Sequence, residues 1–491
     1  MFLRKFSQQR LRGSRGFTQR TRREIKPLPS RIQHLGDEED VSMRDDLPEN
    51  YTDWRWMYRI SSNWSRGRCF VVTQRVGHPT ILGPLVSGAS SARTTTQPEC
   101  QQTTSDSRLT SHLLLVGDLI IYASHKPSEV ATVHIFRDSL GSGLIISYSP
   151  QSTPRVSVTA LSLDHSSANL RLAIFYSDGT WAIYRVDYED GTSTLLYRQP
   201  VAINLLSQNV VQAAYHHPLL VTLSAAFRMS IFYLPAAPSP PVLKHTLSSY
   251  STFYPLTITL SRYRTPDQYR VLLAHASPIY PAHWAPSAMD MMLLVTPIHG
   301  SPDLANVKII SSASTNNSIS LGWIPDGTPY GVPEELRLRW ARKVSHVSGI
   351  QTDGKFVVFA SEDGGIQVGQ FLIPLPTTNL IVVQVYRLHR NAKLLYERTL
   401  FPPAHAPSPR ALSVADSRCI CATRDGGLWV WDLETGIGVQ AAGIQPDDSD
   451  EGVAGSQEGD QPPPIARVAF DAHRIVAVDT TGAIRTYDFD I

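Results

Sequence analysis

The sequence predicts an all-β fold, a seven-bladed β-propeller, on the basis of three observations. A short phrase recurs four times, and in each copy a turn glycine lies five residues before the residue that ends a strand. Seven strand-rich units follow one another between residues 113 and 489. The chain has 491 residues, which is more than one ordinary core supports, and a radial array of repeats is one solution.

The recurring phrase has the composition of a tight turn followed by a strand. Its copies pair Gly179 with Tyr184, Gly364 with Gly369, Gly426 with Trp431, and Gly482 with Tyr487. Glycine accepts the positive φ that a tight turn requires, and aspartate precedes it in three of the copies. The residues after the turn are largely β-branched or aromatic, as expected of strands.

Each unit is expected to form one sheet of about four short strands. An early strand, Cys69 to Val76, is expected to complete the last sheet and close the ring, which removes open sheet edges. The propeller then occupies residues 69–491, with loop insertions at 85–111, 298–335 and 447–460. The units are Leu113 to Asp138, Val156 to Asp187, Val210 to Leu234, Thr257 to Pro297, Val344 to Leu372, Ala411 to Leu433 and Ala466 to Phe489.

Composition excludes several classes of partner. The net charge of +2 provides no general field for nucleic acid. No apolar run approaches the roughly 18 residues of a membrane helix, so we expect a soluble protein without a membrane partner. The 4 cysteines are too few and too unevenly placed for a disulfide framework, which fits a reducing compartment, cytoplasmic or nuclear.

Residues 1–50 form a basic and then acidic tail that we expect to be disordered, because neither half offers an apolar face to bury. No apolar signal-peptide region is present. The Arg-rich opening is also typical of a mitochondrial presequence, which is the lesser alternative to a solvated tail or a nuclear-import patch. A wrongly assigned gene start is a third alternative.

Residues 51–68 predict a short connector helix and a turn. Thr52 or Asp53 is a suitable N-cap, and Gly67 can end the helix. Four side chains fall on one helical face, so the helix is expected to dock on the larger domain. They are those of Trp54, Met57, Tyr58 and Ser61.

No constellation of residues in the sequence predicts catalysis, and we expect no enzyme activity, metal or cofactor. Phosphate-binding glycine loops, a His-Glu-x-x-His helix and Cys-x-x-Cys pairs do not occur. His216 and His217 are interpreted as a loop or edge pair, and Cys419 and Cys421 as core residues on one strand face.

Two other features have specific interpretations. A strand-like segment alternates apolar and basic residues, so that Arg337, Arg339, Arg342 and Lys343 would present positive charge to a partner or simply form a solvated face. Trp431 and Asp432 end the most regular phrase, and both are interpreted as structural, with the ring in the core and the carboxylate held by nearby backbone.

The strand pattern, with Trp431-Asp432 at a strand end, resembles the WD40-like propeller superfamily over about 420 residues. The segment before it is similar to the connector of F-box/WD-repeat proteins, in which a Trp-x-x-x-Tyr helix precedes an Asn-Trp-x-x-Gly turn. The matching positions are Trp54, Tyr58, Asn63, Trp64 and Gly67. This resemblance implies a substrate receptor for the SCF ubiquitin ligase, with a target protein on the propeller rim.

The chain departs from that family at its N-terminal side. An F-box is a helical bundle that opens with a Leu-Pro-x-Glu phrase, and Leu47-Pro48-Glu49 is only a fragment of that phrase, too close to Trp54. The F-box is therefore expected to be missing from this chain, through an error in the gene model or through true loss. An SCF adaptor is a partner only if an F-box is restored. The alternative is a WD40 scaffold that assembles a complex without ubiquitin chemistry.

Overall fold

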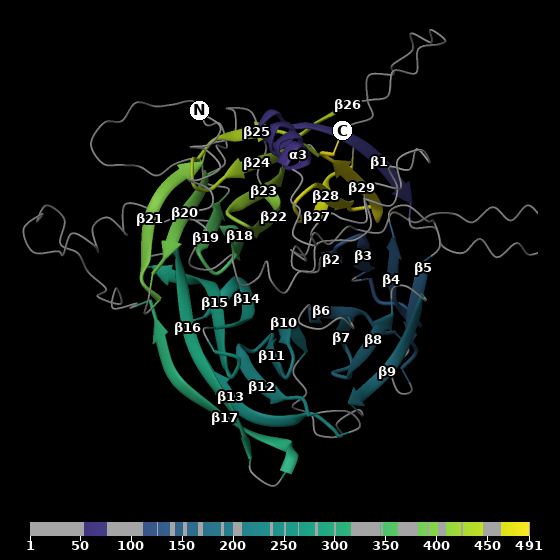
Figure 1. Cartoon of the computed structure of the whole chain (residues 1–491), viewed down its shortest axis with the longest axis vertical. Coiled ribbons are helices and arrows are strands. Elements are labelled where there is room, and N and C mark those ends of the chain that lie inside the picture. The colour runs from purple at the N-terminus through teal and green to yellow at the C-terminus, as the bar shows by residue number, and fades with distance from the viewer. Residues whose placement is uncertain are drawn as a thin grey trace, which may run out of the picture.

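Seven small antiparallel sheets arranged in a closed ring make up the fold (Figure 1), which confirms the predicted seven-bladed propeller. This computed structural model describes residues 54–75, 111–124, 126–137, 143–150, 155–164, 170–187, 191–199, 209–235, 239–249, 252–263, 265–279, 283–298, 301–315, 344, 347–361, 382–389, 392–400, 409–423, 426–444 and 463–490.

Each of the seven sheets contains at least four strands, and a single helix precedes them within the described residues. The helix is α3 (Trp54–Arg66). The first sheet contains β2 (His112–Val116), β3 (Leu119–Ala123), β4 (Ala131–Arg137) and β5 (Gly143–Tyr148), and the second contains β6 (Val158–Asp164), β7 (Leu170–Tyr176), β8 (Trp181–Asp187) and β9 (Thr192–Gln199). The third sheet contains β10 (Val210–His216), β11 (Leu219–Ser224), β12 (Arg228–Tyr233) and β13 (Val242–Ser248). The fourth contains β14 (Phe253–Arg262), β15 (Gln268–Ile279), β16 (His283–Ile298) and β17 (Ser301–Ser314). The fifth is β18 (Val347–Thr352), β19 (Phe356–Ser361), β20 (Val382–Leu388) and β21 (Leu394–Leu400); the sixth is β22 (Pro409–Ala415), β23 (Arg418–Thr423), β24 (Leu428–Asp432) and β25 (Gly438–Gln440); the seventh is β27 (Ile465–Phe470), β28 (Arg474–Asp479), β29 (Ala483–Asp488), β1 (Arg68–Arg75) and β26 (Ala442–Ile444).

The ring is closed by the two ends of the described chain. Strand β1 pairs antiparallel with β29, in a register that runs from Phe70 opposite Asp488 to Arg75 opposite Ala483. The early strand predicted at Cys69 to Val76 is thus confirmed as the closing strand. Because β1 and β29 are far apart in sequence, this pairing joins the first and last described segments in one sheet.

In the described residues the core consists of eight apolar clusters, with two between the fourth and fifth sheets and one between each other pair of neighbouring sheets. Strand β7 shows how one sequence serves two of them. Leu172 and Ile174 pack toward the first sheet, whereas Ala173 and Phe175 pack toward the third. A strand covered on both faces needs a continuous apolar run rather than strict alternation, and the second strands of the units have that composition.

Tight turns lie where the recurring phrase predicts them. Gly179, Gly426 and Gly482 have φ values of 82°, 83° and 92°, which a residue with a Cβ rarely adopts. The carboxylate of Asp178 accepts a hydrogen bond from the Thr180 amide at 3.0 Å and fixes that turn. These residues therefore set the second-to-third strand connections of three sheets.

The fifth unit differs from its prediction. The copy of the phrase at residues 363–369 lies outside the described residues, and the strand that pairs with β19 is β20, beyond the predicted end of the unit at Leu372. The predicted bound was wrong because a long segment, residues 362–381, separates two strands that usually follow each other closely.

The predicted insertion at 298–335 was also wrong over its first part, where β17 forms the outer strand of the fourth sheet. Ala305 and Val307 are buried while Asn306 and Lys308 are exposed, so an alternating pattern is hidden in a polar segment. The insertions at 85–111 and 447–460, and the tail of residues 1–50, lie outside the described residues, apart from Ser111.

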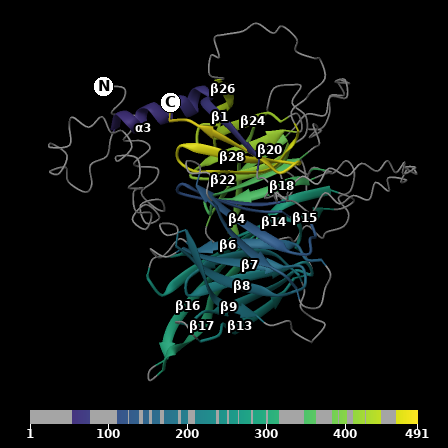
Figure 2. The ribbon, with the colours of Figure 1, turned by 90° about the vertical axis from the view of Figure 1, so that its right-hand side faces the viewer.

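The turns that follow the first and third strands of each sheet lie at the same end of the ring, since neighbouring strands are antiparallel. Helix α3 leads into β1 from that end, and Figure 2 shows it lying across this side of the ring. We call this end the helix face. The other end carries the turns between second and third strands.

Candidate functional site

Helix α3 is anchored to the helix face by Trp64. The indole ring is 4% exposed and stacks on Phe489, with ring centroids 3.9 Å apart and planes at 8°. Its Nε1 donates a hydrogen bond of 2.9 Å to the carbonyl oxygen of Ala472, and the guanidinium of Arg418 lies over the ring at 4.6 Å. The ring thus has an apolar contact, a polar contact and a cation–π contact at once.

Further contacts fix the orientation of the helix. Asn63 donates a hydrogen bond of 2.8 Å from Nδ2 to the carbonyl oxygen of Phe489, and Arg59 forms an ion pair with Asp490. Gly67 ends the helix with a φ of 68°, and a Cβ there would collide with the carbonyl oxygen of Gln440. The segment therefore enters β1 along one defined path.

The structure accounts for three of the five connector residues. Asn63, Trp64 and Gly67 meet at the junction with the sixth and seventh sheets, in the cluster that also holds Ile60. The backbone of Trp54 and Tyr58 lies in α3, but their side chains lie outside the described residues. Of the predicted helical face, only the Ser61 side chain lies within the described residues, where it is half-buried, and the buried side chains of the helix there are Ile60 and Trp64.

Trp431 and Asp432 lie at the end of β24. The ring of Trp431 is 2% exposed and belongs to the cluster between the fifth and sixth sheets. The Asp432 carboxylate accepts hydrogen bonds from the amides of Glu434 at 2.9 Å and Thr435 at 3.4 Å. These contacts hold the turn into β25. The basic segment with Arg337, Arg339, Arg342 and Lys343 lies outside the described residues.

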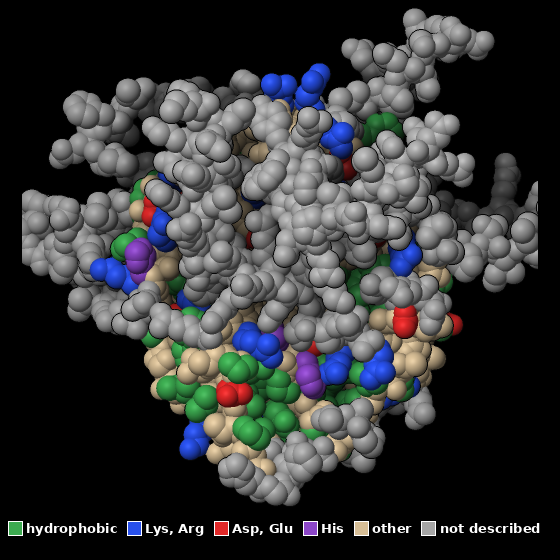
Figure 3. Space-filling model, in the orientation of Figure 1, with side chains coloured by type: hydrophobic (Ala, Val, Ile, Leu, Met, Phe, Trp, Pro, Cys, Tyr) green, Lys and Arg blue, Asp and Glu red, His purple; other side chains and the backbone are tan. Residues whose placement is uncertain are grey.

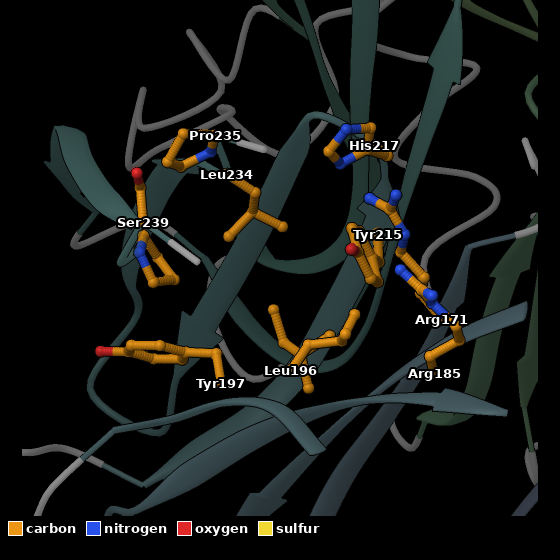
Figure 4. A pocket seen from close by; sticks show the side chains of 11 residues that line it. Arg171, Arg185, Leu196, Tyr197, Tyr215, His217, Leu234, Pro235 and Ser239 are labelled. Carbon is orange, nitrogen blue, oxygen red and sulfur yellow. The ribbon is translucent and has the colours of Figure 1, made fainter. Parts of the chain in front are cut away.

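A pocket of about 290 Å³ opens between the second and third sheets. Figure 4 shows that polar side chains gather on one of its sides, where Arg171 and Arg185 lie beside Tyr215 and His217. The remaining lining is mostly apolar and comes from both sheets. It includes Ile183, Leu196, Tyr197, Leu234, Pro235 and Pro241.

A row of charges crosses the second sheet at this pocket. Asp164 on β6 lies opposite Arg171 on β7, and Arg171 lies opposite Arg185 on β8. Asp164 is fully buried, whereas Arg185 is exposed at the pocket. One carboxylate therefore faces a pair of guanidinium groups, which leaves the row with one positive charge in excess.

Burial and charge both act on the neutral groups beside this row. Burial raises the pKa of Tyr215 to about 12, and Arg171 opposes that rise. Burial lowers the pKa of His217 from 6.5 to about 4, and the positive charge of Arg171 adds to this effect. The imidazole is consequently neutral near pH 7. Its Nδ1 and the Nε of Arg171 are buried and have no hydrogen-bond partner among the residues that the structure describes.

This pocket was not predicted from the sequence, in which His216 and His217 were interpreted as a loop pair. Its residues come from two sheets and extend from Arg171 to Pro241 along the chain, so no local motif joins them. One signal was present: Arg171 and Arg185 each interrupt an otherwise apolar strand, and a charge at such a position needs a partner.

No group of three or more His, Cys, Asp and Glu side chains among the described residues could hold a metal ion. The thiols of Cys69, Cys419 and Cys421 are buried, and burial raises the pKa of the Cys421 thiol to about 12, which makes it unreactive. None of the helices in the described residues has the length and apolar character required to cross a membrane.

No protein-family model and no curated protein matches this sequence. Two similar solved structures are the computationally designed Ika8 protein (13% identity, TM-score 0.37, 77% of this chain and 83% of that chain) and the β-propeller domain of Cps50 (Swd1) from Myceliophteria thermophila (11% identity, TM-score 0.40, 77% and 97%). The topology of the chain itself identifies its fold, since seven four-stranded units close through β1. The chain is a seven-bladed β-propeller.

Proposed function

We propose that this chain is a non-catalytic protein-interaction propeller and that it is the target-binding part of an F-box/WD-repeat substrate receptor for the SCF ubiquitin ligase. The docking of α3 carries this proposal. Trp64 and Asn63 hold the helix on the seventh sheet, so any module attached before Trp54 would have a fixed direction relative to the ring.

Such a receptor works by positioning alone. The propeller would hold a target protein, and the connector would set the distance between that target and the ligase scaffold. Catalytic groups are unnecessary in the receptor, because effective concentration, rather than chemistry, is what it supplies. The rigid helix–sheet contact at Trp64 suits this role better than a flexible linker would.

Purification of the tagged product of the endogenous gene tests the proposal. We expect the ligase adaptor and the cullin to co-purify with the propeller and a target protein, and we expect the target to accumulate when the gene is deleted. Recovery of one stable complex without ligase components would overturn the proposal in favour of the scaffold alternative. The sequence upstream of the Met1 codon provides an independent check, because an F-box reading frame is expected there.

A further inference from the structure

The charge row at the pocket between the second and third sheets is unbalanced. Arg171 and Arg185 lie directly opposite each other on β7 and β8, an arrangement of like charges that is destabilising by about 0.2–1 kcal/mol. Asp164 can balance the charge of Arg171, which it faces. Arg185 makes no ion pair with any residue that the structure describes. One anionic group placed between the guanidinium groups would correct this imbalance.

Unsatisfied hydrogen-bonding atoms lie at the same place. Among the described residues, the Nε of Arg171 is a buried donor without a hydrogen-bond partner, and the Nδ1 of His217 is a buried ring nitrogen without one. Buried polar atoms are nearly always hydrogen-bonded, and a lone buried donor costs about 1–3 kcal/mol. Figure 4 shows Arg171 next to His217 and Tyr215, so their polar atoms converge on one region of the pocket.

The other side of the pocket suits an apolar group. Ile183, Leu196 and Leu234 line it, and its volume of about 290 Å³ fits one large side chain or terminal residue rather than a nucleotide cofactor. On the face of the ring drawn in Figure 3, basic and histidine side chains lie near hydrophobic side chains in the lower part of the molecule. A ligand that carries an oxyanion next to an apolar group is complementary to the basic side and to the apolar side of the pocket.

We propose that this pocket binds an oxyanion carried next to an apolar group on a bound peptide, with Arg185 and Arg171 holding the oxyanion and Leu196 and Leu234 covering the apolar group. The inference names the target chemistry of the proposed receptor and in that sense rests on the proposed function. Its test needs no ligase component, so the two can fail separately.

Calorimetric titration of the full chain with small probes measures this binding. The probes are N-acetylphenylalanine, which carries a carboxylate, and phenyl phosphate, with the neutral N-acetylphenylalaninamide as control. We expect at least one anionic probe to bind about tenfold or more tightly than the neutral amide, because a charged hydrogen bond contributes about 1.5–3 kcal/mol. Whichever anion binds more tightly distinguishes a carboxylate from a phosphate as the natural group.

Two variants that each remove one positive charge test whether the anionic probe binds at the pocket. Arg185→Gln removes an exposed pocket guanidinium and is expected to weaken the anionic probe about tenfold. Arg155→Gln removes an exposed arginine before β6 that does not line the pocket, and it should leave affinity unchanged. Equal binding of the neutral amide, absence of binding by all three probes, or equal affinities in the two variants would each overturn the proposal. Failure of the adaptor to co-purify would bear only on the proposed function.

Discussion

The interface between the sixth and seventh sheets and the interface between the second and third sheets reach the helix face with different side chains. At the first, Trp64 of α3 packs on Phe489 and the apolar cluster below it extends to the surface. At the second, the apolar cluster includes Tyr215 and Leu234 at an open pocket, and charged groups line one side of that pocket. The same position in the ring is filled by an added element in one case and left open in the other.

The two interfaces differ in how fully their polar groups are satisfied in the unbound chain. The helix-covered interface buries an aromatic side chain whose polar atom is satisfied, an arrangement that stabilises the docked helix. The open interface retains like charges and, among the described residues, two buried nitrogen atoms without hydrogen-bond partners, which cost stability in the unbound chain. Unfavourable groups of this kind persist in proteins mainly where a ligand uses them. The four predictions below are ordered by the size of the expected effect.

Substitution of Trp64 by alanine should have the largest effect. The variant loses the stacking on Phe489 and the hydrogen bond to Ala472, and we expect the free energy of unfolding to fall by about 3–5 kcal/mol in denaturant titrations. Ser65→Ala, on the exposed side of the same helix, should change it by less than about 0.5 kcal/mol. Equal effects of the two substitutions would show that α3 is not docked.

A pair of glycines compares the two regions directly. Gly67 at the helix junction and Gly191 before β9 have similar φ values of 68° and 62°. A Cβ at Gly67 meets the Gln440 carbonyl, whereas a Cβ at Gly191 meets nothing within 4 Å. Gly67→Ala should therefore destabilise by about 3 kcal/mol and Gly191→Ala by about 1 kcal/mol, as thermal and chemical unfolding would measure. Similar losses at both positions would contradict the close approach at Gln440.

Local sequence predicted the elements that depend on local physics. The turn glycines, the end of α3 and the seven units were found because positive φ, capping and strand composition are encoded within a few residues. Strand β17 was missed because its Ser- and Asn-rich exposed positions give it the composition of a loop. Strand β20 was missed because the chain between it and β19 is unusually long.

Of the two candidate sites, the connector could be predicted from local sequence and the pocket could not. Asn63, Trp64 and Gly67 lie within five residues of one another, and their pattern could be recognised before their contacts were known. The pocket depends on the register that aligns Arg171 with Arg185 and on the neighbouring sheet that brings Tyr215 beside them. Register and sheet neighbours follow from the whole fold, so this site needed the structure.

The pH dependence of stability should reveal the buried imidazole at the pocket. The pKa of His217 is lowered from 6.5 to about 4, so between these values the unfolded chain binds a proton that the folded chain does not. Stability contributed by neutral His217 is therefore present above pH 6.5 and is lost as the pH falls toward 4. Neighbouring Arg171 and His216 strengthen the effect and Asp164 opposes it.

Denaturant titrations at about pH 7.5 and about pH 5 measure this contribution. The wild-type chain should lose roughly 1 kcal/mol more on acidification than His217→Gln, allowing for solvent at the pocket. An identical response of the wild-type chain and His217→Gln would show that the imidazole is solvated, which would remove one of the two buried atoms that point to a ligand.

The smallest expected change in the free energy of unfolding is that of Arg185→Gln, and it is the one expected to be stabilising. Arg185→Gln removes one member of a like-charge pair, so the unbound chain should gain about 0.5 kcal/mol of stability while its affinity for an anionic probe falls. Arg155→Gln removes the same charge elsewhere and should change neither quantity. A loss of more than about 1 kcal/mol in Arg185→Gln would mean that Arg185 already has a stabilising contact in the unbound chain. The open interface would then be as complete in itself as the one that α3 covers.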